Sequence, residues 1–123
     1  MGIQFFLLVA AGGAIGSVLR AFLSFLLVSF APWPTLLVNL LGGFFIGIFV
    51  KTMEDSSNPD FFRAFWIVGL CGGFTTFSTF GIEILEHFRQ SEWLLGSLYL
   101  LGNLLGSVAA ILLGFRFYAF IQS

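Results

Sequence analysis

The chain has 123 residues, of which 59% are hydrophobic and 9% charged, and its mean hydropathy is +1.04. Because so little polar surface could not enclose a soluble core, the composition predicts a membrane protein. The net charge of -1 argues against nucleic acid and against a peripheral protein held by electrostatics. A single cysteine, Cys71, excludes an intramolecular disulfide framework and a multi-cysteine metal site, and we interpret it as a small packing residue.

The first apolar segment covers residues 3–30 and lacks a basic start and a small-residue cleavage site, so we expect a retained transmembrane helix. Gly12, Gly16, Arg20 and Ser24 recur at every fourth position and would share one helix face. The two glycines favour close approach of another helix. Arg20 lies inside the apolar run, where charge is costly, and either a structural role or a role in attracting anions remains open.

A second helix is predicted from Thr35 to Lys51, after a proline turn at residues 31–34 that carries the interfacial residue Trp33. A four-residue repeat would place a hydroxyl, an amide and two glycines on one face: Thr35, Asn39, Gly43 and Gly47. A buried amide in lipid needs a partner, so by itself Asn39 is expected to hydrogen-bond a neighbouring helix. The hydrophilic residues 52–60 predict a surface loop.

The third segment runs from Phe61 to His87 and would be about 40 Å long as one helix. Near its middle, residues 72–80 read Gly-Gly-Phe-Thr-Thr-Phe-Ser-Thr-Phe, and these are weak helix formers. We therefore expect a broken backbone near the bilayer centre, packed in protein or lining a polar cavity, because lipid has no partner for freed backbone groups. Glu83 lies one turn beyond Phe80, and His87 is expected to have a surface role rather than proton or metal chemistry.

A fourth helix is predicted from Glu92 to Tyr118. Its Tyr99, Asn103 and Ser107 recur at i, i+4 and i+8 and form a polar ladder in an apolar helix. A stripe of small residues beside the ladder favours close packing: Gly102, Gly106, Ala110 and Gly114. Structural hydrogen bonding could account for the ladder, although three spaced donors are harder to attribute to packing than one amide.

The prediction is an all-α membrane protein in which residues 1–123 form a single four-helix transmembrane domain. Lys and Arg barely distinguish the two sides of the membrane, so the orientation signal is weak and both orientations are possible. Two antiparallel copies could then pair about a two-fold axis in the membrane plane. Such a dimer could surround a polar pathway, whereas one set of thin helices could scarcely do so.

The sequence contains no enzyme constellation, since it lacks paired buried carboxylates, a nucleophile beside a base, a phosphate loop and zinc-type ligand spacing. What it offers inside the membrane is hydrogen-bond donors, namely Asn39, Ser78, Thr79, Tyr99, Asn103 and Ser107. Phe77 and Phe80 can also present the positive edges of their rings. These groups suit a small, strongly hydrated anion, although most of the 18 phenylalanines must simply pack or face lipid.

Several of these motifs resemble the Fluc family of bacterial fluoride channels, which are camphor-resistance or CrcB-type membrane proteins. Residues 72–80 look like the family's third-helix signature, and Gly-Gly-Ala-Ile-Gly-Ser-Val-Leu-Arg at 12–20 looks like its first-helix pattern. Thr-Leu-Leu-Val-Asn-Leu-Leu-Gly at 35–42 is similar to its second-helix motif, and Gly106-Ser107 to its fourth. The resemblance covers the whole chain, in order and with matching length.

The resemblance implies a dual-topology, antiparallel homodimer in the bacterial plasma (inner) membrane, crossed several times by each chain. It implies two pores per dimer that conduct fluoride passively out of the cell and so give fluoride resistance. It also implies a structural sodium ion at the two-fold axis, held by the backbone carbonyls of Gly72 and Thr75 from each subunit. Such freed carbonyls would be hard oxygen ligands in a dry interior.

By the same resemblance, Phe77 and Phe80 would be the aromatic pair that lines the pore, and Asn39 would be its amide. The polar track would consist of Ser78, Thr79, Tyr99, Asn103 and Ser107. Arg20 would lie toward the aqueous vestibule and Glu83 near the end of the pathway. One departure from the family pattern is Ile111, one turn beyond Ser107, where some members continue the polar track.

Two alternatives remain open from sequence. A small proton-coupled multidrug exporter can also be a four-helix dual-topology dimer, but it needs a membrane-embedded carboxylate, typically on the first helix. The first helix here has none, so Glu83 would be the only candidate. A non-transporting packing subunit would explain the glycine stripes but would leave the polar ladder without a use.

Overall fold

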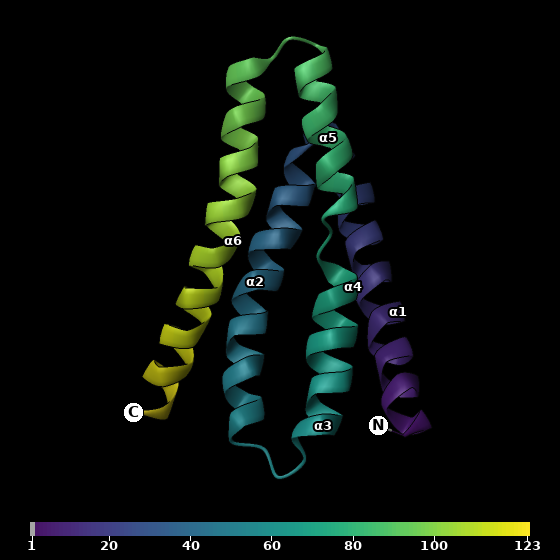
Figure 1. Ribbon diagram of the computed structural model, residues 1–123, viewed down its shortest axis with the longest axis vertical. Coiled ribbons are helices and arrows are strands. Elements are labelled where there is room, and N and C mark those ends of the chain that lie inside the picture. Colours follow the sequence, from purple (N-terminus) through teal and green to yellow (C-terminus); the bar gives the residue numbers. More distant parts are fainter. Residues whose placement is uncertain (1) are drawn as a thin grey trace.

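The computed structural model describes residues 2–123, which form an all-helical fold. Within these residues, four helical stretches are long and apolar enough to cross a membrane: Ile3–Leu26, Trp33–Glu54, Pro59–Arg89 and Trp93–Gln122. The stretches run roughly alongside one another, and the chain termini lie at the same end of the molecule (Figure 1). This arrangement confirms the four membrane segments that the sequence predicts.

The elements follow one another along the chain in this order: α1 (Ile3–Leu26), η1 (Val28–Phe30), α2 (Trp33–Glu54), α3 (Pro59–Phe62), η2 (Arg63–Cys71), α4 (Gly72–Phe74), α5 (Ser78–Arg89) and α6 (Trp93–Gln122). Helix α2 begins before the predicted Thr35 because Pro34 occupies its first turn, where a missing N–H costs nothing. Helix α6 runs beyond the predicted Tyr118 to Gln122. The π-helix η2 was not predicted, since the sequence carries no simple signal for its wider turns.

Residues 75–77 separate α4 from α5 and form a short non-helical connection, seen in Figure 1 as a thin line between the two coiled ribbons. Thr75 has an extended backbone with φ of -82° and ψ of 158°. Its hydroxyl donates a 3.0 Å hydrogen bond to the carbonyl oxygen of Cys71, which its own N–H also contacts. Two glycines followed by hydroxyl residues that bond the backbone locally explain why helical geometry is interrupted here.

Buried glycines bring the helices together, as the small-residue stripes predict. A Cβ on Gly12 or Gly16 of α1 would collide with the backbone of η2. A Cβ on Gly47 of α2 would collide with the Ile111 carbonyl oxygen of α6, and one on Gly114 with the Phe44 carbonyl oxygen of α2. These contacts hold α1 against the third membrane stretch and α2 against α6.

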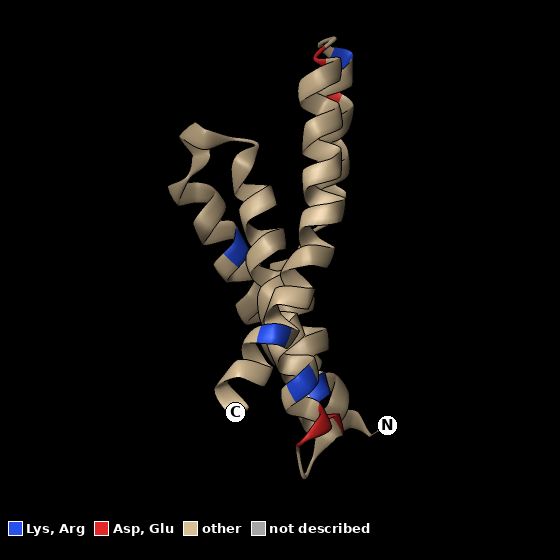
Figure 2. Cartoon of the chain, turned by 90° about the vertical axis from the view of Figure 1, so that its left-hand side faces the viewer, with Lys and Arg blue, Asp and Glu red and all other residues tan. Residues whose placement is uncertain are grey.

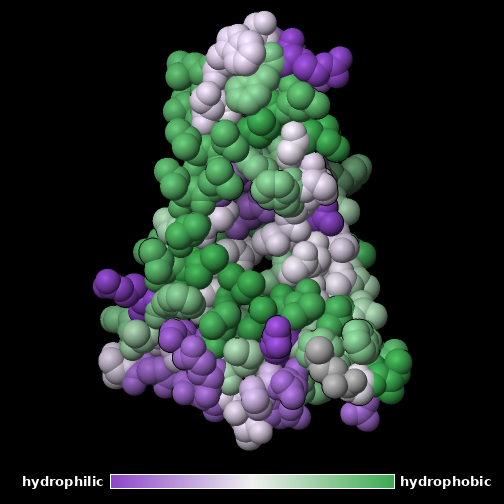
Figure 3. All heavy atoms as spheres, viewed as in Figure 1, coloured by the Kyte–Doolittle hydropathy of each residue, from purple (hydrophilic) through white to green (hydrophobic). Residues whose placement is uncertain are grey.

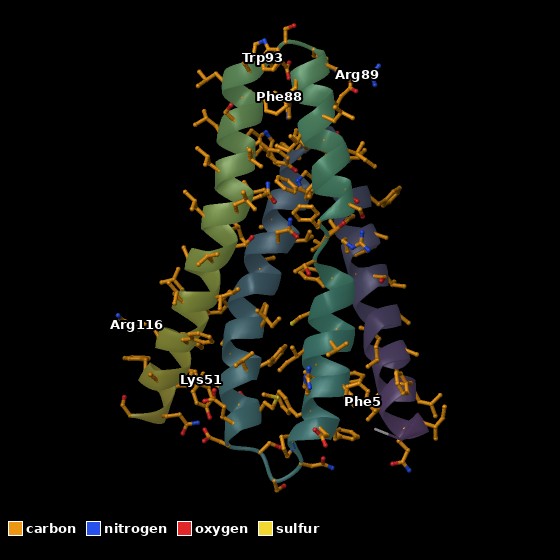
Figure 4. All side chains as sticks on the ribbon, in the orientation of Figure 1. Phe5, Lys51, Phe88, Arg89, Trp93 and Arg116 are labelled. Atoms are coloured by element: carbon orange, nitrogen blue, oxygen red, sulfur yellow. The ribbon has the colours of Figure 1, made fainter. Side chains whose placement is uncertain are left out.

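Viewed from the side, the molecule opens into two arms, and most of its charged residues lie toward its ends (Figure 2). The surface between the ends is largely apolar, with hydrophilic atoms around a hollow near the middle (Figure 3). Lys51 and Arg116 lie toward one end, and Arg89 lies at the other (Figure 4). This pattern is that of a helical bundle whose apolar belt faces lipid.

The prediction of a surface role for His87 is wrong, because this residue is only 9% exposed. Its Nδ1 lies 2.6 Å from a carboxylate oxygen of Glu92, and its ring packs edge-on against Tyr99. The chain reverses at Ser91, whose φ is 61°, so α6 folds back over the last turn of α5. This reversal covers a residue that an isolated helix end would expose.

Substitution of Gly114 by alanine should lower the free energy of unfolding. The new Cβ would collide with the Phe44 carbonyl oxygen and lie 3.1 Å from the Gly47 Cα atom, and overpacking of this kind typically costs about 1–3 kcal/mol. Gly81→Ala is the matched control, because a Cβ there meets no atom within 4 Å. Thermal unfolding in detergent measures both variants, and a Gly114→Ala protein as stable as the parent would contradict the close α2–α6 contact.

Candidate functional site

The central cavity has a volume of about 380 Å³ and lies between α2, residues 75–77, the start of α5, and α6. Its polar lining consists of Asn39, Thr75, Thr76, Asn103 and Ser107, and its aromatic lining of Phe77 and Phe80. Among residues 2–123, no charged side chain lines this space. The structure therefore gathers around one cavity five residues of the predicted fluoride pore, namely Asn39, Phe77, Phe80, Asn103 and Ser107, together with Thr75, one of the two predicted sodium ligands.

A two-way hydrogen bond joins the side chain of Asn39 to the backbone of Thr76. The N–H of Thr76 donates to Asn39 Oδ1 at 2.9 Å, and Asn39 Nδ2 donates to the Thr76 carbonyl oxygen at 3.1 Å. Thr76 lies between two helices, so its backbone groups lack the partners that a continuous helix would provide. The amide of Asn39 therefore supplies the hydrogen bonds that the interruption removes.

The same amide connects α2 to α6. Asn39 Nδ2 donates a second hydrogen bond of 2.8 Å to Asn103 Oδ1, and Asn103 Nδ2 donates to the Tyr99 carbonyl oxygen at 3.1 Å. Asn103 is 3% exposed, which makes it one of the most buried polar side chains described. Asn103, the middle residue of the polar ladder on α6, therefore hydrogen-bonds to Asn39 of α2, which in turn hydrogen-bonds to Thr76.

Thr76 was not among the site residues predicted from sequence. Its Oγ1 accepts a 3.3 Å hydrogen bond from the N–H of Thr79, as an N-terminal capping residue does at the start of a helix. Its hydroxyl proton has no acceptor among residues 2–123, so it remains available to the cavity. A hydroxyl residue directly before an apolar segment was the sequence signal for this cap.

Phe77 and Phe80 are neighbours with very different surroundings. Their ring centroids are 5.5 Å apart, and the ring planes meet at 67° in an edge-to-face arrangement. Phe80 is 3% exposed and also packs against Tyr99, whereas Phe77 is 74% exposed. The ring of Phe80 is therefore held by packing within this chain, whereas this chain leaves most of the Phe77 ring uncovered.

The carboxylate of Glu83 lies beyond the cavity lining and is held by hydroxyl groups from two other helices. Thr35 Oγ1 donates to one of its oxygens at 2.8 Å, and the Tyr99 hydroxyl donates to the other. That hydroxyl also lies 3.2 Å from the carbonyl oxygen of Pro32. Glu83 thus links α2, α5 and α6 at the side of the cavity that faces the α5–α6 turn.

Arg20 contacts the third membrane stretch through its side chain. Its Nε donates a 3.1 Å hydrogen bond to the carbonyl oxygen of Gly73, which Ser17 Oγ also approaches at 3.5 Å. This contact gives Arg20 a structural function, one of the two roles left open by the sequence. The carbonyl oxygens of Gly72 and Thr75 accept no hydrogen bond from residues 2–123.

Three residues of the predicted polar track lie outside the cavity lining: Ser78, Thr79 and Tyr99. Ser78 is exposed on the outside of α5, and Tyr99 is 1% exposed against Glu83 and His87. Ile111 lines the cavity one turn beyond Ser107, so the polar part of the lining on α6 ends at Ser107. Sequence spacing predicted which of these side chains share a helix face, but it could not predict which of those faces line the cavity.

Replacement of Thr76 by valine should destabilise the start of α5. Valine keeps the shape of the side chain but removes the oxygen that accepts from Thr79, and loss of an N-terminal cap costs about 0.5–2 kcal/mol. Amide hydrogen exchange of Thr79 should therefore accelerate. Thr76→Ser retains the oxygen and is the control, and equal exchange rates in both variants would argue against the cap.

Comparison with known proteins identifies the family. Residues 7–115 match the family described as CrcB-like protein, Camphor Resistance (CrcB). A protein of Azobacteroides pseudotrichonymphae is 42% identical over an alignment of 113 residues that covers 88% of this chain and 90% of the relative. A protein of Thermus thermophilus is 39% identical over an alignment of 120 residues that covers 94% of each chain, and both relatives are named fluoride-specific ion channel FluC. The chain therefore belongs to the CrcB-like family.

Proposed function

We propose that this protein is a fluoride-selective ion channel, rather than an enzyme, that lets fluoride leave the cell passively. The observation that carries the proposal is the central cavity, in which neutral hydrogen-bonding residues and two aromatic rings lie among aliphatic side chains, with no charged side chain in the lining among residues 2–123. Neutral donors stabilise an anion without the strong binding that a lysine or arginine would impose. The names of the relatives support fluoride as the anion that passes.

Conduction would exchange the hydration shell of fluoride for protein donors. The Thr76 hydroxyl and the Ser107 hydroxyl both line the cavity, and neither proton has an acceptor among residues 2–123. The positive edges of the Phe77 and Phe80 rings would add a weak attraction that needs no full charge. A narrow path with these groups would accept a small anion and fit larger halides poorly.

The functional unit in this proposal is an antiparallel homodimer with two pores in the bacterial inner membrane. Phe77 is 74% exposed although it lines the cavity, so a partner subunit could complete the wall on that side. Gly72, on the preceding turn, is also exposed. Lys51 and Arg116 lie toward one end of the molecule, Arg63 follows the α2–α3 loop at that end, and Arg89 lies at the other end. So small a difference in positive charge gives only a weak preference for one orientation.

A structural sodium ion at the two-fold axis fits the donor atoms that this chain offers. The Gly72 and Thr75 carbonyl oxygens accept no hydrogen bond from residues 2–123, and once a partner subunit covered them they would be costly without a ligand. Two such oxygens from each subunit would give the ion a set of hard ligands. Its positive charge would lower the cost of placing an anion nearby in a medium of low dielectric constant.

The structure gives no particular support to the proton-coupled exporter. Glu83, its one candidate carboxylate, lies outside the cavity lining and accepts hydrogen bonds from Thr35 and Tyr99. An exporter of organic cations needs an acidic group that the substrate can reach. The channel is therefore the function that the geometry supports best.

Purified protein in liposomes should release fluoride under a clamped potential and release almost no chloride. Phe77→Ile and Phe80→Ile should each slow fluoride release about two- to tenfold, because aromatic contacts contribute about 0.5–1.5 kcal/mol and about 1.4 kcal/mol corresponds to a factor of ten. A fluoride electrode measures the release. Phe25→Ile is the control, since Phe25 is 75% exposed and distant from the cavity lining.

Absence of fluoride release from correctly assembled parent protein would rule out the channel. Release that is unchanged in both aromatic variants would leave a channel but remove the role of the ring edges. Loss of resistance to hydrophobic cations in Glu83→Gln, with fluoride release intact, would instead favour the exporter.

Native mass spectrometry should detect a dimer of two 13.5 kDa chains that retains one sodium ion. Exchange of all sodium for potassium should lower the unfolding temperature, because a ligand bound only to the folded dimer stabilises it by mass action. Detection of a monomer, or of a dimer whose unfolding temperature does not change when sodium is replaced, would contradict this part of the proposal.

The orientation of the subunits can be read in intact cells by thiol labelling. Ser57→Cys places a reactive thiol in the α2–α3 loop, while the native Cys71 is buried. An impermeant thiol reagent outside intact cells should label about half of the Ser57→Cys chains if both orientations are inserted equally. Labelling of all chains or of none would exclude the antiparallel arrangement.

A further inference from the structure

A buried histidine lies outside the cavity, near the turn that joins α5 to α6. We propose that His87 forms a second, acid-activated site for a small anion, in which Nε2 of the imidazole contacts the ion. The inference rests on the proposed fluoride channel and deepens it, because this site would supply fluoride to the pathway when the imidazole is protonated. It gives a function to a titratable group that conduction through the cavity does not use.

His87 belongs to a cluster that joins the α5–α6 hairpin to the start of α2. Its ring contacts the ring of Tyr99, with the centroids 5.6 Å apart, and Trp33 of α2 meets the same Tyr99 ring edge-on at 6.0 Å. The Tyr99 hydroxyl also lies 3.2 Å from the carbonyl oxygen of Pro32. The α5–α6 turn extends beyond the start of α2 (Figure 1), so His87 lies toward the aqueous end of this cluster.

Glu92 fixes the ring of His87. Nδ1 lies 2.6 Å from a carboxylate oxygen of Glu92, and the Glu92 N–H donates a 2.9 Å hydrogen bond to the His87 carbonyl oxygen. An ionised carboxylate can only accept a hydrogen bond, so Nδ1 carries a proton. The other ring nitrogen, Nε2, then has a lone pair in the neutral imidazole and an N–H in the imidazolium ion.

Nε2 of His87 is the ring atom that remains available to a ligand. It has no hydrogen-bond partner among residues 2–123, and those residues contain no fully buried polar side-chain atom without a partner. Nε2 is therefore reached by solvent, although the residue as a whole is buried. A hydrogen bond from a charged donor that is partly removed from water is stronger than one at a fully exposed position.

Few groups that can carry charge lie around His87. Glu92 of α6 faces the imidazole directly, and the phenol of Tyr99 contacts the ring. Helix α2 contributes only neutral side chains to this cluster. The other ionisable groups on the last turns of α5 are Glu83, which accepts a hydrogen bond from Tyr99, and the exposed pair of Glu86 and Arg89.

Protonation of His87 reverses what an anion meets at this position. Beside the neutral imidazole, an anion would face the lone pair of Nε2 and the negative charge of Glu92. In the imidazolium ion, the positive charge balances that of Glu92 and Nε2 offers an N–H. Histidine ordinarily changes its charge between pH 5 and 8. The site would therefore take up a small anion that accepts hydrogen bonds, such as fluoride, as the pH falls through this range.

NMR of isotope-labelled histidine can detect the contact directly. The chain contains a single histidine, so the imidazole signals of the assembled protein, prepared without a histidine tag, report on His87 alone. At about pH 5.5, sodium fluoride should shift the Nε2 signal more than the Nδ1 signal, and at about pH 8.5 it should shift neither. Sodium chloride at the same ionic strength controls for screening. Absence of a fluoride-dependent shift at the lower pH, or an equal shift with chloride, would overturn the inference.

Fluoride release from liposomes at a low fluoride concentration gives an independent test. The parent protein should release fluoride about two- to tenfold faster at about pH 5.5 than at about pH 8.5, because one hydrogen bond changes an equilibrium by that factor. His87→Gln retains an amide donor for Glu92 but does not titrate. Its release rate should therefore stay near the parent's rate at the higher pH. Protein-free liposomes measure the passage of neutral hydrogen fluoride through lipid, which is subtracted at each pH.

Two carboxylate variants separate the charge that faces His87 from charge elsewhere on the hairpin. Glu92→Gln should raise fluoride release at the higher pH, because it removes a negative charge beside Nε2. Glu86→Gln is the matched control, since Glu86 is exposed and its carboxylate lies 3.7 Å from Arg89. The pH profile of this variant should match that of the parent.

Equal pH profiles in the parent and in His87→Gln would overturn the inference and leave the channel standing. Absence of fluoride release from the parent at every pH would instead refute the proposed function on which the inference rests. If His87→Gln does not assemble, the NMR titration of the parent protein still decides whether fluoride contacts Nε2.

Discussion

The two-way hydrogen bond between the Asn39 amide and the Thr76 backbone is the interaction on which the central site depends. Residues 75–77 are not helical, and lipid cannot satisfy the backbone groups that such a segment exposes. One asparagine from α2 satisfies both the N–H and the carbonyl of Thr76. The segment that carries Phe77 is thereby held in a defined position, and a gap between helices becomes a cavity with fixed walls.

This bond is possible because glycines allow the helices to approach closely. Gly47 and Gly114 bring α2 against α6, so the Asn39 amide also reaches Asn103. Gly12 and Gly16 hold α1 against η2, and Arg20 then reaches the Gly73 carbonyl just before residues 75–77. The small residues therefore make the amide hydrogen bonds possible, because closely packed backbones bring short polar side chains within hydrogen-bond distance.

The arrangement also separates charge from the cavity. Glu83 is the carboxylate closest in sequence to residues 72–80, and hydroxyl groups of Thr35 and Tyr99 hold it outside the lining. The cavity itself is lined by neutral hydrogen-bonding residues, by Phe77 and Phe80 and by aliphatic side chains. An anion there would meet attraction strong enough to replace part of its hydration shell yet weak enough to release it, which is the balance that conduction requires.

The sequence by itself determined the four membrane segments, the weak helix formers at residues 72–80 and the polar spacing on the second and fourth helices. These are local properties, because hydropathy and four-residue periodicity depend only on neighbouring positions along one chain segment. The tertiary structure alone decided which polar groups remain available. It engages both amide protons of Asn39, adds Thr76 to the lining, leaves Ser78 outside and buries His87 beneath α6. A hydrogen-bond partner lies on another helix, and its identity follows only from how closely and in which register the helices pack.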